Sequence, residues 1–147
     1  MKKSDYLKLL VDDIHSVVIA SIDSEGRPTT RVIDMMYQDS KNVYFLTANT
    51  KAFYKHLKEN PYISVTGMTQ GNSTMERKMI SLSGKAECIG REKLNILLDH
   101  NPYMYDIYPT EDGRKVLEVF CFAYARGEFY DLTVLPPRID SFEIKGE

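Results

Sequence analysis

Short β-branched runs separated by turn residues fill most of this sequence. The runs SVVIASID and TTRVIDMMY flank the turn SEGRP, so residues 16 to 37 are predicted to form a hairpin. QDSKN then turns the chain into VYFLTA, and QGNST separates the run YISVTGMT from KMISLSGKAECI. Hairpins of this kind predict an antiparallel sheet rather than a doubly wound parallel one.

Helices are predicted at three places around these strands. One follows VYFLTA and ends at Asn60-Pro61, because the residue before a proline resists helical geometry. A second, GREKLNILLDHN, carries three leucines on one face. A short amphipathic helix capped by Ser4 is expected at the N-terminus, where it would cover one end of the sheet.

The C-terminal third continues the strand pattern. KVLEVFCFAYARG and EFYDLTV are predicted as two strands, RIDSFEI as a last edge strand, and Gly84 as a bulge or bend in the long run before them. The predicted fold class is therefore mainly β: a six- to seven-stranded antiparallel split barrel with α insertions. At 147 residues the chain is expected to form a single domain, residues 1–147.

Composition disfavours several classes of partner. The net charge of −2 and the absence of tryptophan disfavour nucleic acid, and no apolar run approaches the roughly 20 residues of a membrane span. Cys88 and Cys121 are isolated, which fits buried thiols in a reducing compartment, and we expect a cytoplasmic protein. The three histidines lie far apart, so no metal site is predicted, and no phosphate loop or nucleophile motif occurs.

The helix after VYFLTA has an unusual charge pattern. Its N-terminus, which favours negative charge, opens with Asn49, Thr50 and Lys51 instead of an acid. Unpaired N–H groups, a hydroxyl and one cation there could hold a phosphate, and Arg31 in the middle of a strand could join them. Alternatively, Asn49 or Thr50 only caps the helix, its lysines form a solvated face, and Arg31 points outward from the barrel.

Three stretches of the sequence carry a resemblance that covers roughly residues 14 to 100: ASIDSEGRPTTRVIDMMY, VYFLTANTKAFYKHLKENPYISV and ISLSGKAECI. In order and spacing they resemble the pyridoxamine 5′-phosphate oxidase-like family of FMN-binding split barrels. The resemblance implies FMN as cofactor and a homodimer with the flavin in a cleft between protomers. It also implies an oxidoreductase that acts on a small molecule, with NADH or NADPH as a candidate electron donor.

The resemblance also implies roles for nine residues. Arg31 and Lys51 would bind the FMN phosphate, and Asn49 and Thr50 would assist them. Residues of the two flanking strands would border the isoalloxazine ring and the ribityl chain: Val32, Ile33, Leu46, Thr47 and Ala48. Two alternatives remain: a non-enzymatic flavin-binding module, and a split barrel that binds haem or the deazaflavin F420 instead of FMN.

The sequence departs from the family pattern in three respects. Asn49-Thr50-Lys51 stands where the family often has Ser-Arg-Lys, Met36 takes the position of a lysine, and the C-terminus lacks an arginine-rich substrate motif. We therefore do not expect this protein to oxidise pyridoxamine phosphate.

The segment PYMYDIYPTEDG contributes three tyrosines whose role the sequence leaves open. Tyr103, Tyr105 and Tyr108 could form a lid that stacks on a planar substrate, or they could provide aromatic packing at a dimer interface.

Overall fold

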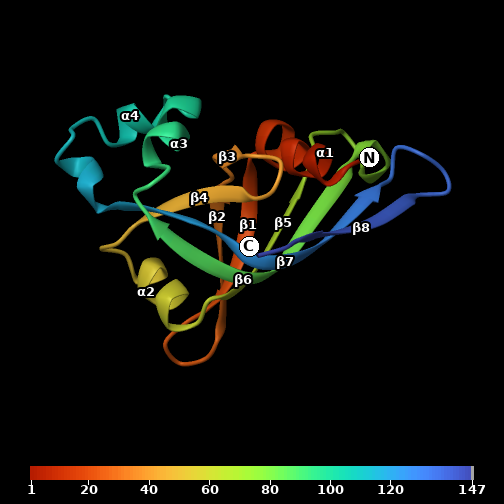
Figure 1. Cartoon of the computed structure of the whole chain (residues 1–147). Helices are drawn as coiled ribbons and strands as arrows, with labels where there is room; N and C mark the ends of the chain where they lie inside the picture. Colours follow the sequence, from red (N-terminus) through yellow and green to blue (C-terminus); the bar gives the residue numbers. More distant parts are fainter. Residues whose placement is uncertain (147) are drawn as a thin grey trace.

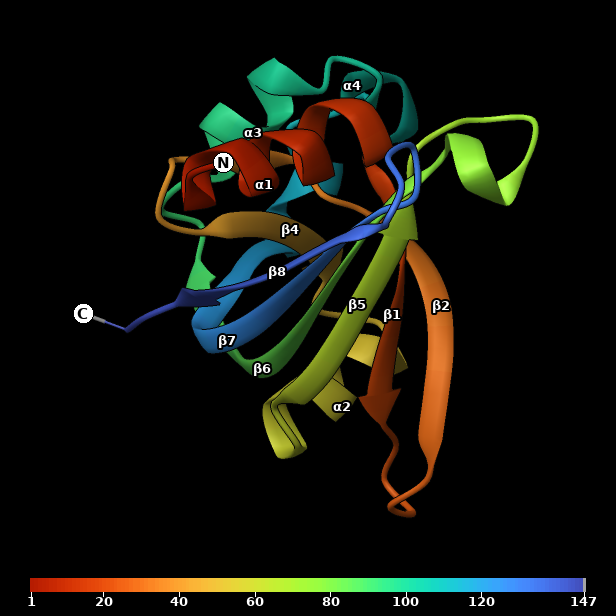
Figure 2. The same cartoon turned by 90° about the vertical axis from the view of Figure 1, so that its right-hand side faces the viewer.

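One curled antiparallel sheet dominates the computed structural model, which describes residues 1–146 (Figures 1 and 2). Its strand order is β2-β1-β5-β6-β7-β4-β3, with β8 paired to β7 outside this path. The strands are β1 (Ser16–Ile22), β2 (Pro28–Asp34), β3 (Tyr37–Gln38), β4 (Val43–Ala48), β5 (Tyr62–Met68), β6 (Lys78–Gly90), β7 (Leu117–Asp131) and β8 (Arg138–Ile144). Seven of them have at least six residues, and the predicted split-barrel fold class is confirmed.

The central strand β7 has two different neighbours along one edge. It pairs with β6 from Val119 to Asp131 on the other edge, whereas β4 pairs with Leu117–Phe120 and β8 with Ala125–Asp131. Between these two partners, the side-chain amide of Asn42 takes the place of a strand. Its Nδ2 donates to Phe122 O at 2.7 Å, and the Phe122 N–H donates to its Oδ1 at 3.1 Å. The sheet therefore splits at Phe122 without leaving backbone groups unpaired.

Strand β7 also corrects one prediction. KVLEVFCFAYARG and EFYDLTV are one continuous strand, not two, and no turn occurs at Gly127. The glycine instead makes room for a side chain of β8, because a Cβ at Gly127 would overlap the ring of Phe142. Similarly, Gly84 is not itself the bulge. The register of β6 shifts between Lys85 and Ala86, while Gly84 lies directly against the backbone of β7.

The helices lie at the two ends of the sheet. They are α1 (Lys3–Lys8), a π-helical turn (Leu9–Ile14), α2 (Ala52–Glu59), α3 (Leu94–His100) and α4 (Met104–Ile107), with 3₁₀ turns at Thr74–Glu76 and Gly113–Val116. Helices α1, α3 and α4 gather at one end, and α2 lies at the other (Figures 1 and 2). No helix within residues 1–146 is long and apolar enough to cross a bilayer.

The N-terminal helix covers one end of the sheet as predicted, but Ser4 is not its cap. The helix begins at Lys3, so Ser4 already lies in the first turn. The Asp5 carboxylate instead accepts the backbone N–H of Lys2 at 2.8 Å. An acid in the first turn also suits the partial positive charge of a helix N-terminus.

Two apolar clusters hold these elements together. The larger fills the barrel, where Phe45 stacks on Phe120 and the N-terminal helix contributes Leu7 and Leu10. The smaller lies under α3 and α4 and includes Leu97. The second cluster fixes α4 beside the N-terminal half of β7, next to the gap between β2 and β4.

Replacement of Asn42 by alanine tests the split. Asn42→Ala leaves the N–H and C=O of buried Phe122 without these partners, and an unsatisfied buried group costs about 1–3 kcal/mol. We expect the free energy of unfolding in urea to fall by at least about 2 kcal/mol. The control Asn72→Ala, in a loop, should change it by less than about 0.5 kcal/mol. Equal effects of the two substitutions would contradict the role of Asn42.

Candidate functional site

A cleft of about 340 Å³ lies between β2, β4, the start of α2 and α4. Seven of the nine residues predicted to bind the cofactor line it: Arg31, Val32, Ile33, Leu46, Thr47, Ala48 and Lys51. Within residues 1–146, strand β2 pairs only with β1, while β4 pairs with β7 and β3. The cleft therefore lies where β2 and β4 are not paired with each other. The fold thus brings together β2 and the segment of β4 and α2, which are separate in the sequence.

One end of the cleft is basic. The Nε of Arg31 is buried and has no hydrogen-bond partner within residues 1–146, and its guanidinium carbon lies 4.3 Å from the centroid of the Phe53 ring. Lys51 is the N-cap residue of α2 and is exposed. A cation held over an aromatic face with a free donor is oriented for an anionic group that enters the cleft.

The N-terminus of α2 has no side-chain cap and no acid in its first turn. The alternative in which Asn49 or Thr50 caps this helix is therefore wrong. The N-cap residue is Lys51, so Asn49 and Thr50 both precede the cap position. The Asn49 side chain instead donates from Nδ2 to the Glu118 carboxylate at 2.9 Å. The first backbone N–H groups of α2 remain available beside Lys51, which favours an anion at this point.

Asn49 and Thr50 lie outside the residues that line the cleft. The hydrogen bond from Asn49 is the main cause that lowers the pKa of Glu118, and the Tyr54 hydroxyl, 3.0 Å from the same carboxylate, lowers it further. Burial, together with this hydrogen bond, raises the pKa of Tyr54 to about 12. The assisting role of Asn49 and Thr50 at a phosphate stays a prediction.

The opposite wall of the cleft is apolar and comes from the segment whose role the sequence left open. Met104, Ile107 and Tyr108 line it. The other two tyrosines do not: Tyr105 donates to Asp99 at 2.9 Å, and Tyr103 donates to Asp34 at 2.7 Å. Only Tyr108 of the three is therefore placed to meet a ligand in the cleft.

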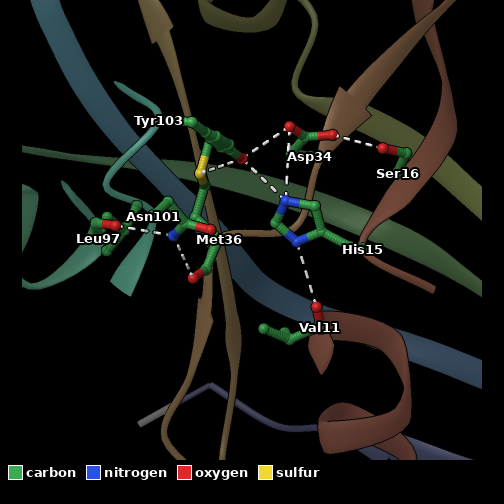
Figure 3. Close-up of polar contacts among 8 residues, drawn as sticks. All are labelled: Val11, His15, Ser16, Asp34, Met36, Leu97, Asn101 and Tyr103. Atoms are coloured by element: carbon green, nitrogen blue, oxygen red, sulfur yellow. Dashed lines mark hydrogen bonds and ion pairs between the residues drawn. The ribbon is translucent and has the colours of Figure 1, made fainter. Parts of the chain in front are cut away.

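Several lining residues were missed by the sequence-based prediction, and two of them are polar or close to polar contacts. Asp34, the last residue of β2, and Met36 both border the cleft. Met36 is buried and its carbonyl accepts a hydrogen bond from Asn101 at 2.8 Å. Asp34 accepts from Ser16 and Tyr103 (Figure 3). No local motif marks Asp34, because its partner Tyr103 lies 69 residues away along the chain.

Comparisons with known proteins agree with this geometry. The model of the family described as pyridoxamine 5′-phosphate oxidase matches residues 5–130, and the chain belongs to this family. No curated protein sequence matches the chain.

Solved structures share the fold at low sequence identity. A NimC/NimA family protein from Clostridium acetobutylicum is 20% identical with a TM-score of 0.71, over 94% of this chain and 88% of that one. A haem-binding protein from Mycobacterium smegmatis is 14% identical with a TM-score of 0.72, over 97% of this chain and 58% of that one. A pyridoxamine 5′-phosphate oxidase-related, FMN-binding protein from Nostoc punctiforme is 10% identical with a TM-score of 0.59, over 96% and 90%.

The contact between Asn49 and Glu118 is expected to depend on pH. A carboxyl group whose pKa is lowered on folding stabilises the folded state above its unfolded pKa of about 4.3, and this stabilisation is lost as the pH falls through the folded value. Asn49→Ala should therefore lower the free energy of unfolding by about 0.5 kcal/mol at pH 7, a value discounted for exposure.

The difference from wild type should shrink as the pH falls below the unfolded pKa of Glu118, because the carboxylate that Asn49 stabilises becomes protonated. Thr50→Ala is the matched control, because Thr50 is the exposed neighbour of Asn49 and does not touch Glu118. Urea unfolding at several pH values measures both variants. A deficit in Asn49→Ala that is constant with pH would contradict the assignment.

Proposed function

We propose that this protein is an FMN-binding oxidoreductase that acts on a small molecule other than pyridoxamine phosphate. The observation that carries the proposal is the pairing of Arg31, with its buried unpartnered Nε, and Lys51 at the uncapped start of α2, at one end of a cleft whose far wall is apolar. A planar ring with a phosphate tail requires this division into an apolar part and an anion-binding part.

The residues of the cleft fit such a cofactor. Arg31 and Lys51 would hold the phosphate, with Asn49 and Thr50 near its outer side. Val32 and Ile33 of β2 and the residues Leu46–Ala48 of β4 would border the ring and the ribityl chain. Bound flavin would supply hydride or electron transfer, while the chain binds it, excludes water and admits the second substrate.

The proposed substrate class follows from Met36. At the position where the family often has a lysine, this chain has a thioether with 6% of its surface exposed, so no cation is available there for a second phosphate group. We infer a substrate without a phosphate group near this point.

A second copy of the chain would complete the cleft. Its volume of about 340 Å³ lies at the lower end of the roughly 300–1,000 Å³ of ligand pockets, so a cofactor would extend beyond one protomer. The outer face of β1, β5 and β6 has the composition of an interface. It presents Val18 and Tyr62, both more than 40% exposed, around the hydroxyl pair Ser64–Ser83. We infer a homodimer through this face.

Haem or F420 in place of FMN, and a flavin-binding module without enzymatic activity, are the competing functions. The fold shared with the haem-binding protein from M. smegmatis is the observation in favour of haem. The absorption spectrum of the freshly purified protein separates the three ligands. Turnover with NADH or NADPH and an electron acceptor then distinguishes an oxidoreductase from a binding module.

The role of Lys51 can be tested by calorimetric titration. FMN should bind more tightly than riboflavin, which lacks the phosphate. Lys51→Ala removes one charge-assisted hydrogen bond, worth about 1.5–3 kcal/mol, so FMN affinity should fall roughly ten- to a hundredfold while riboflavin affinity stays unchanged. Lys55→Ala is the control, because this exposed lysine of the same helix does not line the cleft. Equal affinities for FMN and riboflavin in the wild type would remove the phosphate argument.

The dimer face can be tested by light scattering. The wild type should have twice the mass of the chain at micromolar concentration. Tyr62→Arg places a charge within the proposed face and should shift the protein to monomers and weaken FMN binding. Lys41→Glu, on the exposed loop before β4, should leave the mass unchanged. A wild-type monomer in the presence of FMN would rule out a shared cleft.

A further inference from the structure

A hydrogen-bonded group of three side chains lies beside the cleft (Figure 3). His15 follows the π-helical turn and has a φ of 62°, an uncommon conformation for a residue other than glycine. Its Nδ1 lies 3.2 Å from Val11 O, and its Nε2 lies 2.8 Å from the Tyr103 hydroxyl. The π-helical turn therefore directs the imidazole toward Tyr103.

The hydroxyl of Tyr103 also contacts Asp34. It lies 2.7 Å from Asp34 Oδ2, and His15 Nε2 lies 3.5 Å from the same oxygen. The other carboxylate oxygen, Oδ1, accepts a hydrogen bond from the Ser16 hydroxyl at 2.7 Å. Three atoms, His15 Nε2, Tyr103 Oη and Asp34 Oδ2, thus form a chain of two short contacts.

The number of hydrogens in this chain follows from its donors and acceptors. Val11 O is a carbonyl and only accepts, so Nδ1 of His15 carries a hydrogen. The contacts Nε2–Oη and Oη–Oδ2 each need one hydrogen, but the Tyr103 hydroxyl supplies only one. The second hydrogen belongs either to Nε2, which makes His15 an imidazolium beside a carboxylate, or to Asp34, which then is a neutral acid.

Both arrangements satisfy every contact, and they differ only by the shift of two hydrogens along the chain. The Tyr103 hydroxyl donates its hydrogen to Asp34 Oδ2, so the hydrogen of the Nε2–Oη contact comes from His15. Burial and the hydrogen bond to Asp34 raise the pKa of Tyr103, which keeps its hydroxyl protonated. The group therefore holds one proton more than a neutral histidine and an ionised aspartate would.

The group connects two cavities. Asp34 lines the candidate cofactor cleft, whereas His15 lines a second cavity of about 500 Å³ between the π-helical turn, β3 and α3. The other titratable groups that line this cavity are Asp12 of the π-helical turn, Tyr37 of β3 and His100 of α3. His15 and Asp34 have about a third of their side-chain surface exposed, so solvent reaches both ends of the chain.

We propose that His15, Tyr103 and Asp34 form a proton relay that delivers a proton from the second cavity to a ligand reduced in the cleft. The inference rests on the proposed function, because the ligand needs the proton only when it has gained a hydride equivalent from a two-electron donor. Asp34 is the member next to the ligand, and His15 and Tyr103 act through it.

The transfer balances in protons and electrons. The Nε2 hydrogen of His15 passes to Tyr103 Oη, and the Tyr103 hydroxyl hydrogen passes to the Asp34 carboxylate. The reduced ligand then takes this proton from the Asp34 carboxyl group, which becomes a carboxylate again. The donor is oxidised by two electrons and the ligand gains one hydride and one proton. His15 is left neutral, with Nδ1–H still bound to Val11 O, and regains a proton from water in the second cavity.

The stored proton can be observed without any cofactor. In the apo protein labelled with ¹⁵N-histidine, both ring nitrogens of His15 should be protonated at pH 7. In Asp34→Asn the amide can donate to Tyr103 Oη, so a neutral His15 satisfies the network and Nε2 should lose its hydrogen. Tyr105→Phe is the control, because it removes a hydroxyl bound to an aspartate at a distance from His15. An unprotonated nitrogen of His15 in the wild type at pH 7 would overturn the proposal.

Transfer of the proton can be measured on the FMN-loaded, reduced protein with two acceptors. Tetramethyl-1,4-benzoquinone takes up a hydride and a proton, whereas ferricyanide takes up an electron and no proton. Tyr103→Phe should slow quinone reduction by at least about tenfold, which is less than the usual rate contribution of a group that transfers protons. Ferricyanide reduction should be unchanged. Tyr105→Phe should change neither rate.

The outcomes separate the two proposals. Equal slowing of both acceptors in Tyr103→Phe would mean that Tyr103 only supports the structure, and an unchanged quinone rate would mean that no proton passes through it. Either result overturns the relay and leaves the proposed function intact. Failure of the wild type to bind FMN would instead overturn the proposed function, while the ¹⁵N measurement still decides whether the group holds the extra proton.

Discussion

The split of β7 between two neighbours is the constraint on which the rest of the structure depends. A strand that keeps one partner on each edge continues a sheet, whereas β7 exchanges β4 for β8 at Phe122. The exchange would leave a buried N–H and C=O without partners, and the side-chain amide of Asn42 satisfies both. Because β4 no longer pairs with β7 beyond this point, it can turn away from β8 and form one wall of the cleft, and β2 forms the facing wall.

The start of α2 has neither an acid nor a side-chain cap, and contacts with other elements explain the missing cap. Asn49, two residues before the N-cap position, donates to Glu118 of β7 and does not cap the helix. Lys51 becomes the N-cap residue without any side chain to satisfy the first N–H groups. Arg31 reaches the same region from β2 and has Phe53 of α2 beneath its guanidinium. The anion-binding character of the cleft therefore depends on contacts among three elements, not on one motif.

The elements that depend on local sequence patterns could be predicted from the sequence. The hairpin of β1 and β2, the strand–helix–strand unit around α2 and the edge strand β8 follow from turn residues and periodicity. The length of β7 could not be predicted, because Gly127 resembles a turn residue unless one knows that Phe142 lies against it. Seven residues of the cleft came from the resemblance to the family. His15, Asp34 and Tyr103 had no such signal, since their contacts span 19, 69 and 88 residues of sequence.

The position of β2 at an open edge affects how the protein without ligand can associate with other chains. Within residues 1–146, β2 pairs with β1 alone, and its Val32 side chain is 69% exposed. A free edge of this kind is a template for strand addition by another chain, and aggregation begins at such edges. A ligand seated against β2 and β4 covers that edge as a further strand would. In the proposed function, a cofactor bound in the cleft would therefore also shield this edge of the newly folded chain from self-association.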